Sequence, residues 1–153
     1  MKVRRFVSKW MPVIAWMLLI FAGSSDALSA EHTSRFLIPF LRWLDPAISF
    51  QTILAIHFTL RKIGHFTEYA ILAALLWRAL RGTFVAMTWW ALTFSVLLVT
   101  AAFAASDEFH QLFVPSRTAS AHDVMIDCIG ALVAVLLCSL FASKRKQAAP
   151  AER

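Results

Sequence analysis

The chain has 153 residues, of which 59% are hydrophobic and only 16% are charged. Soluble domains carry about a quarter charged residues, so this composition excludes an ordinary water-soluble protein, and the absence of repeats or low-complexity tracts excludes disordered and fibrous chains. The formal net charge is +6, but the basic residues are spread along the chain instead of gathering on one soluble face. We therefore expect one domain, residues 1–153, whose partner is the lipid bilayer and not nucleic acid.

Four apolar stretches predict an all-α integral membrane bundle of four transmembrane helices. The stretches are residues 10–25, 64–80, 85–105 and 124–142. The third is uncharged and long enough to cross about 30 Å of hydrocarbon as a helix. The second is the weakest because it contains His65 and Glu68, and in the last only Asp127 interrupts the apolar run.

Residues 24–60, between the first two predicted spans, are expected on the extracytoplasmic side. Residues 46–60 are free of Lys, Arg, Asp and Glu but short for a span. We expect a re-entrant or interfacial helix there, and a fifth span is the alternative. Residues 35–44 mix basic and bulky apolar side chains, a composition that suits the outer membrane surface.

The distribution of Lys and Arg predicts the orientation. With an inside amino terminus, ten of the fifteen basic residues face the cytoplasm, in the tails 1–9 and 144–153 and in the turn 78–81. The positive-inside rule then gives a multi-pass protein of the cytoplasmic (inner) membrane with both termini in the cytoplasm. Alternatively, the first stretch is a signal peptide cleaved near the small residues 27–29, which leaves the other helices in the same orientation.

The two cysteines do not indicate a disulfide or a zinc pair. Cys128 and Cys138 are ten residues apart in one apolar run, which on a single helix separates them by about 15 Å. We interpret both as small apolar helix residues.

The acids and histidines are distributed differently from the basic residues. Eight of the nine acids and all five histidines fall outside or in outer helix ends, although the positive-inside rule says little about acids. Ionisable residues at membrane depth usually face a protein interior or a wet cavity. We therefore expect these helix ends to converge on an outward-facing polar site, joined by residues 24–26 and roofed by residues 24–60. The candidate residues are His65, Glu68, Asp107, Glu108, His110, Gln111, Arg117, Asp123 and Asp127.

The spacing of these residues predicts which of them share a helix face. Arg61, His65 and Glu68 are separated by four and three residues and so lie on one face. The alternative is a simple interfacial ion pair of Arg61 or Lys62 with Glu68.

The next group follows the apolar stretch 85–105. Asp107 and His110, and likewise Glu108 and Gln111, are three residues apart, and each two can share a helix face if the helix continues. Acids at the carboxyl end of a helix oppose its dipole, which favours a functional reason for them. A solvated helix end is the alternative.

The last group opens the final helix. Ser120 and Asp123 have the spacing of a capping box. Asp127 lies one turn deeper on the same face, and Gly130 permits close approach of another helix. Arg117 lies between two acid-bearing helix ends, so we expect carboxylates of the cluster to hold its guanidinium.

These motifs resemble the VanZ-like family of small bacterial membrane proteins. The similarity is carried by residues 65–69 (HFTEY), residues 107–117 (DEFHQLFVPSR) and residues 123–130, and it extends over about residues 24–130. Asp26 stands where the family often has Gln, and Ser116 where it often has Gly. The resemblance implies a link with the cell envelope, since the namesake is associated with teicoplanin resistance, but it implies no known reaction.

Three classes of function fit these features. The first is an enzyme that acts on a lipid-linked or envelope substrate, with the acids and histidines in acid–base roles, Arg117 binding phosphate or carboxylate, and a divalent metal as a variant. The second is a non-enzymatic binding or accessory protein for glycopeptides, peptidoglycan precursors or a membrane partner. The third, ion-coupled transport, is disfavoured because the inner halves of the helices lack ionisable residues apart from their basic ends.

Overall fold

A computed structural model describes the backbone of residues 2–26 and 30–148 and the side chains of residues 3–26 and 33–143. The predicted all-α class is confirmed, because the described residues form five helices and no strand. The helices are α1 (Lys2–Gly23), α2 (Ala30–Leu44), α3 (Phe50–Thr83), α4 (Trp89–Gln111) and α5 (Ala121–Ala148). The alternative cleavage site at 27–29 and the side chains of the basic tail 144–153 lie outside the described residues.

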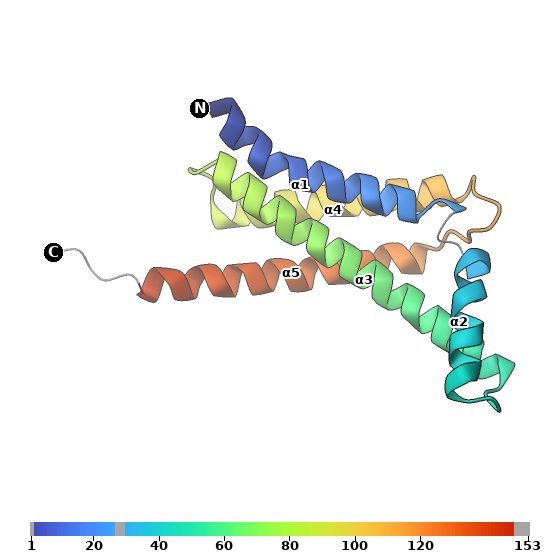
Figure 1. The fold of residues 1–153 in the computed structure, drawn as a ribbon. Coiled ribbons are helices and arrows are strands. Elements are labelled where there is room, and N and C mark those ends of the chain that lie inside the picture. Colours follow the sequence, from blue (N-terminus) through green and yellow to red (C-terminus); the bar gives the residue numbers. More distant parts are fainter. Residues whose placement is uncertain (1, 27–29, 149–153) are drawn as a thin grey trace.

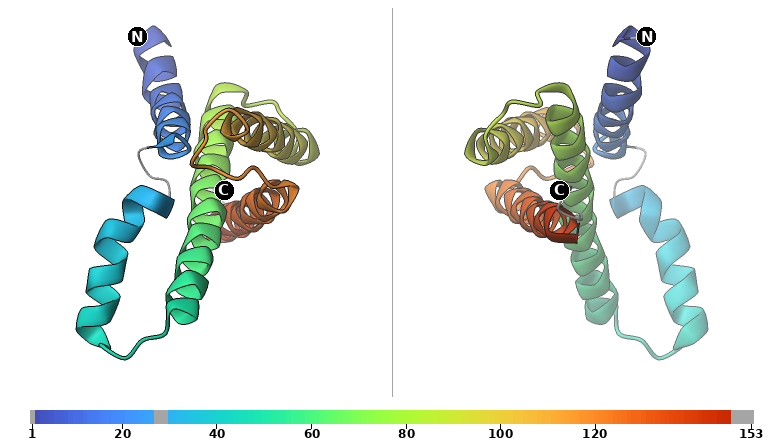
Figure 2. Two further views of the ribbon diagram at one scale, coloured as in Figure 1. Left: turned by 90° about the vertical axis from the view of Figure 1, so that its right-hand side faces the viewer. Right: turned by 90° about the vertical axis from the view of Figure 1, so that its left-hand side faces the viewer.

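Helix α3 is the centre of the bundle. It contacts α1, α2, α4 and α5, and Figure 2 shows it between α1 on one side and α4 and α5 on the other. The start of α1 lies beside the end of α3, where Lys9 donates a hydrogen bond to the Gly82 carbonyl and Trp10 Nε1 lies 3.1 Å from Thr83 Oγ1. The long helices therefore alternate in direction, and α1 begins on the side of the bundle where α5 ends (Figure 1).

The core is made of apolar side chains of α1, α3, α4 and α5 that meet around α3. Its buried members include Val13, Ile20, Tyr69, Leu72, Ala73, Leu76, Val96, Ala104, Ala131 and Val135. Small residues let the backbones approach closely. At Gly130 of α5 even a Cβ atom would collide with the backbone carbonyl of Phe66 in α3, so the expected close approach at this glycine is confirmed.

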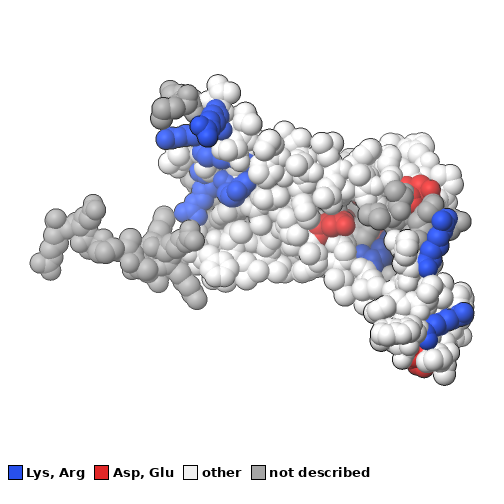
Figure 3. All heavy atoms as spheres, viewed as in Figure 1, with Lys and Arg blue, Asp and Glu red and all other residues white. Residues whose placement is uncertain are grey.

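The outer surface of the bundle is apolar as well. Leu18, Phe94 and Leu140 are each more than half exposed, as expected for side chains that face lipid and not water. Among the described residues, three helices are long and apolar enough to cross a membrane, namely α1, α4 and α5. On the face drawn in Figure 3, charged atoms gather mainly toward the two ends, and most of the surface between them is uncharged.

The structure of residues 46–60 differs from the separate re-entrant or interfacial helix that the sequence predicts. Residues 50–60 form no separate element but are the first part of α3, which begins after Ser49, whose Oγ accepts the Thr52 N–H at 3.1 Å. The basic pair at 61–62 marks a change in composition but not a helix end, because no proline interrupts residues 50–83. The 34-residue helix is about 50 Å long, well beyond the hydrocarbon thickness. Helix α2 packs along it with Phe36 and Trp43 exposed.

Candidate functional site

Four helices bring their polar residues together at one end of the bundle. The buried polar or charged residues there, which we call the polar cluster, are Ser24, His65, Asp107, Glu108, Gln111, Asp123 and Asp127. Among the described residues, Thr100 is the one other buried polar side chain of this kind. The expected convergence of α1, α3, α4 and α5 is therefore observed.

Asp123 is the most heavily paired acid of the polar cluster. Its Oδ2 lies 3.1 Å from Arg61 Nη2, and its Oδ1 accepts a hydrogen bond from Lys62 Nζ. His65 Nε2 lies 3.8 Å from the same Oδ2. The basic residues at the entry of the predicted second span therefore pair with the first turn of α5, and not with Glu68 as the alternative interpretation proposed.

The capping box of Ser120 and Asp123 that was expected at the start of α5 does not form. The Ser120 N–H donates to Glu108 Oε2 at 2.6 Å, and Ser120 Oγ accepts the His122 N–H at 3.2 Å. The Asp123 carboxylate, which should have closed the box, is directed to the α3 cations. The physical reason is that charged partners from another helix bind a carboxylate more strongly than a backbone N–H does.

His65 and Asp127 form a buried pair between α3 and α5. His65 Nδ1 lies 3.1 Å from Asp127 Oδ1, and both residues are more than nine-tenths buried. Because Asp127 engages Nδ1, the other ring nitrogen of His65 points toward the first turn of α5. The carboxylate therefore sets the orientation of the imidazole.

Asp107 is held by α1 and by its own helix. Its Oδ2 accepts hydrogen bonds from Ser24 Oγ at 2.6 Å and from Gln111 Nε2 at 3.3 Å. The helix continues to Gln111, but the spacing of Asp107 and His110 does not bring the two side chains together, since the His110 ring packs against Phe21 with 4.2 Å between centroids. The buried face of α4 continues from Asp107 to Gln111 at a spacing of four, and His110 lies beside that face at the contact with α1.

Glu108 does not pair with Gln111 either. Its hydrogen bond goes to the backbone of Ser120, and the Gln111 carbonyl oxygen Oε1 accepts from Arg61 Nη2 at 3.3 Å. Arg61 also donates to the Thr118 carbonyl at 2.9 Å. Partners outside α4 therefore decide the contacts of Glu108 Oε2 and of Gln111 Oε1, whereas Gln111 Nε2 donates to Asp107 within α4.

Arg117 is held by carbonyls and not, as expected, by carboxylates. Its Nη2 donates to the carbonyls of Gly23 and Ser25, and its Nε reaches the Ser25 carbonyl at 3.2 Å. The guanidinium thus caps the carboxyl end of α1. Burial lowers the pKa of Arg117 below its usual range, but a guanidinium stays charged at neutral pH.

A pocket of about 310 Å³ adjoins the polar cluster. Its lining residues are Gly23, Ser24, Thr33, Leu37, His57, Leu60, Arg61, Gly64, His65, Glu68, Ser116 and Arg117. Glu68, which is half-buried, lies in this wall and not among the buried acids. The segment 24–60 contributes the other wall, in agreement with its expected role as a roof.

Two lining residues, His57 and Thr33, were missed by the sequence reasoning. His57 Nε2 lies 3.1 Å from Thr33 Oγ1 and so joins α3 to α2 at the pocket. The available signal was spacing: His57 precedes Arg61 by four residues and His65 by eight, which places all three on one helix face. Sequence alone does not bring out this spacing, because the composition of residues 46–60 predicts a segment separate from the following helix.

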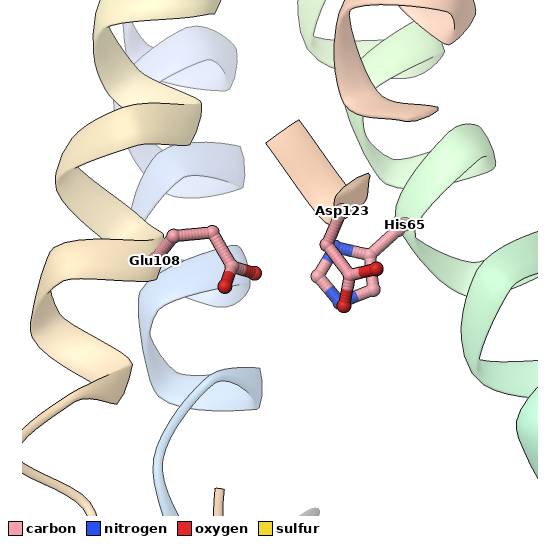
Figure 4. Close-up of side chains that lie close together, drawn as sticks. All are labelled: His65, Glu108 and Asp123. Carbon is pink, nitrogen blue, oxygen red and sulfur yellow. The ribbon is translucent and has the colours of Figure 1, made fainter. Parts of the chain in front are cut away.

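Three side chains of the polar cluster have the composition of a metal site. His65, Glu108 and Asp123 each offer one ligand atom, and these atoms lie within 4.8 Å of one another. Figure 4 shows them approaching from α3, α4 and α5.

Comparison with known proteins agrees with the motifs. A profile of the VanZ/LLP1 family matches residues 9–142, a range that contains the whole polar cluster. No curated protein and no solved structure matches the chain. Since the matched range is most of the chain, this protein belongs to the VanZ/LLP1 family.

Proposed function

We propose that this protein is a small multi-pass membrane protein of the cell envelope whose extracytoplasmic pocket binds an anionic, lipid-linked or other envelope-derived ligand. The observation that carries the proposal is the 310 Å³ pocket, whose wall combines cationic and apolar side chains. Such a wall suits a ligand with a charged head and an apolar chain.

The membrane arrangement that we propose has four spans. The three apolar helices pack around α3, so residues 61–83 of α3 would be the fourth span, shielded by the others. The contact of Lys9 with Gly82 places the start of α1 and the end of α3 on one side, and the excess of Lys and Arg favours the cytoplasm for that side. Helix α2 and residues 50–60 would then form the interfacial segment on the outer surface.

Single-cysteine labelling tests this topology. On a background lacking Cys128 and Cys138, Asp45→Cys should react with an impermeant thiol reagent in intact cells, because Asp45 lies in the exposed turn between α2 and α3. Gln147→Cys should react only after the cells are permeabilised. Labelling of Gln147→Cys in intact cells would contradict cytoplasmic termini.

The recognition of an anion rests on Arg117. The hydrogen bonds of its guanidinium go to neutral carbonyls, so these partners position its charge without neutralising it. Arg61, by contrast, pairs with Asp123. Leu37 and Leu60, which also line the pocket, supply apolar surface for the chain of the ligand.

Binding of a long-chain polyprenyl phosphate to the detergent-purified protein tests the proposal, with the uncharged polyprenol of the same length as the matched probe. The phosphate should bind at least tenfold more tightly than the alcohol. Arg117→Ala should weaken phosphate binding about tenfold, and Arg117→Lys less, since an ammonium can also bind carbonyls and phosphate. Arg42→Ala, a change of an exposed arginine on α2 outside the pocket, should have no effect. Equal binding of both probes would refute an anion site.

The alternative is an enzyme that acts on such a ligand, which the acids beside the pocket favour. His65 lines the pocket and touches Asp127, so it can exchange a proton with a bound molecule. Alanine replacements separate the two functions in a teicoplanin-susceptibility assay. A binder should show graded losses, whereas an enzyme should lose its effect outright at one or two positions. Transport is less well supported, because Thr100 is the one buried polar side chain described beyond the polar cluster.

A further inference from the structure

We propose that His65, Glu108 and Asp123 bind one divalent transition-metal ion inside the polar cluster. This proposal does not depend on the pocket ligand, since two of the three residues lie outside the pocket wall. It rests on the geometry of the three side chains, on a buried Glu108 oxygen that has no partner among the described residues and on the charge balance of the cluster.

The geometry comes from three helices. The ligand atoms of the three residues lie within 4.8 Å of one another. An ion of this class holds its ligands at about 2.0–2.2 Å, so small side-chain movements would bring all three to a common centre. In Figure 4 the Glu108 carboxylate extends from α4 toward Asp123 and His65.

The second observation concerns buried oxygens without hydrogen bonds. Glu108 is 6% exposed, and its Oε1 has no hydrogen-bond partner among the described residues. Asp123 Oδ2 also accepts no hydrogen bond among them, but Arg61 Nη2 lies 3.1 Å away as its ion-pair partner, so the oxygen without any partner is the one of Glu108. Buried polar atoms are nearly always satisfied in folded proteins, so an unmatched carboxylate oxygen aimed at a histidine and a second carboxylate indicates a missing positive partner.

The charge balance points the same way. The polar cluster holds four buried carboxylates, of Asp107, Glu108, Asp123 and Asp127. In the described residues, Arg61 and Lys62 both pair with Asp123, and His65 lies within ion-pair distance of Asp123 and Asp127. The other three carboxylates receive hydrogen bonds from hydroxyl, amide, backbone and imidazole groups. With the four carboxylates ionised and His65 neutral, as a metal-bound imidazole is, two negative charges are left over. One divalent cation would compensate them, and uncompensated buried charge costs several kcal/mol per ion.

The donor set selects the type of ion. One imidazole nitrogen with carboxylate oxygens suits Zn²⁺ or Mn²⁺ better than Mg²⁺ or Ca²⁺, which prefer oxygen alone. Asp127 already engages His65 Nδ1 at 3.1 Å, and so leaves Nε2 on the side of Asp123. A carboxylate that orients a ligating histidine through its other nitrogen is the usual second partner at such sites. Asp127 would therefore be a positioning residue.

The test measures metal directly on the full-length protein in detergent. Protein purified without chelator should contain about one equivalent of zinc or manganese by elemental analysis. After chelator treatment, titration with Zn²⁺ and with Mn²⁺ should show one saturable site for at least one of the ions, and that ion should raise the melting temperature. Less than about 0.1 equivalent on purification, together with no saturable binding of either ion, would overturn the proposal.

Variants locate the site. Glu108→Gln and His65→Gln should each weaken metal binding at least tenfold, and Asp127→Asn about 10–100-fold because the imidazole loses its orientation. His122→Gln removes an exposed histidine next to Asp123 and should leave the affinity within twofold of wild type. Monodisperse elution of each variant shows that it folds. If Glu108→Gln and His65→Gln both bind like wild type, or His122→Gln weakens binding as much as they do, the assignment fails.

Discussion

The two ends of the helix bundle differ in the sign and the burial of their charged side chains. Where α1 begins and α3 ends, Arg78 and Arg81 are exposed, and Lys9 reaches a backbone carbonyl. At the other end, four carboxylates and a histidine are buried. Exposed basic side chains need no partner from another helix, whereas buried acids do. The first end is therefore explained by insertion into a membrane, and the second requires a further reason.

We infer that the acids at this end form a binding site, because burying them does not by itself stabilise the fold. A buried carboxylate carries a desolvation penalty that partners repay only in part. Replacing such groups by apolar ones of similar size is often neutral or stabilising. Substitutions at the two ends should therefore affect stability and binding differently.

The largest expected effect is on packing beside the polar cluster. Gly130→Ala should destabilise the protein by about 3 kcal/mol, because the new Cβ would collide with the Phe66 backbone carbonyl and force α3 and α5 apart. Thermal unfolding in detergent should record this as a fall of several degrees in the melting temperature. Gly64→Ala is the matched control, since a Cβ there meets nothing within 4 Å and alanine favours the helix. Equal stability of the two variants would contradict the observed helix contact.

A strong effect on binding with little loss of protein is expected at Asp127. Asp127→Leu should insert into the membrane and accumulate at least as well as wild type, because a mid-helix aspartate is unfavourable by up to about 3 kcal/mol for insertion. It should nevertheless lose metal binding and function, because His65 loses its partner. Asp127→Asn should retain part of both. Membrane abundance by immunoblot and metal content check this, and a fully active Leu variant would remove Asp127 from the site.

The smallest effect is expected at the opposite end. Lys9→Ala removes one part-buried hydrogen bond to a backbone carbonyl and should cost about 1 kcal/mol or less of unfolding free energy. It should change neither metal content nor polyprenyl phosphate binding. A loss of either in this variant would show that the two ends are coupled, and would weaken the distinction drawn between them.

The sequence predicted the membrane class, the helices and the members of the polar cluster. Ionisable residues inside long apolar runs or next to their ends stand out by composition alone, so His65, Glu108, Asp123 and Asp127 could be named without a structure. The close approach at Gly130 could be predicted in the same way, because a glycine beside a buried acid has few other uses.

What only the tertiary structure decided is which residue meets which. Local spacing suggested a shared face for Asp107 and His110 and a capping box of Ser120 with Asp123, and the position of Arg117 between two acidic helix ends suggested carboxylate partners. The structure instead pairs Asp107 with Ser24 and Asp123 with Arg61, and it directs Arg117 to carbonyls at the end of α1. The continuity of α3 through residues 50–83 was likewise decided in three dimensions, and it brought His57 to the pocket. The physical reason is that a local helix contact contributes a few tenths of a kcal/mol. A buried charge therefore takes the stronger partner that packing brings from another helix.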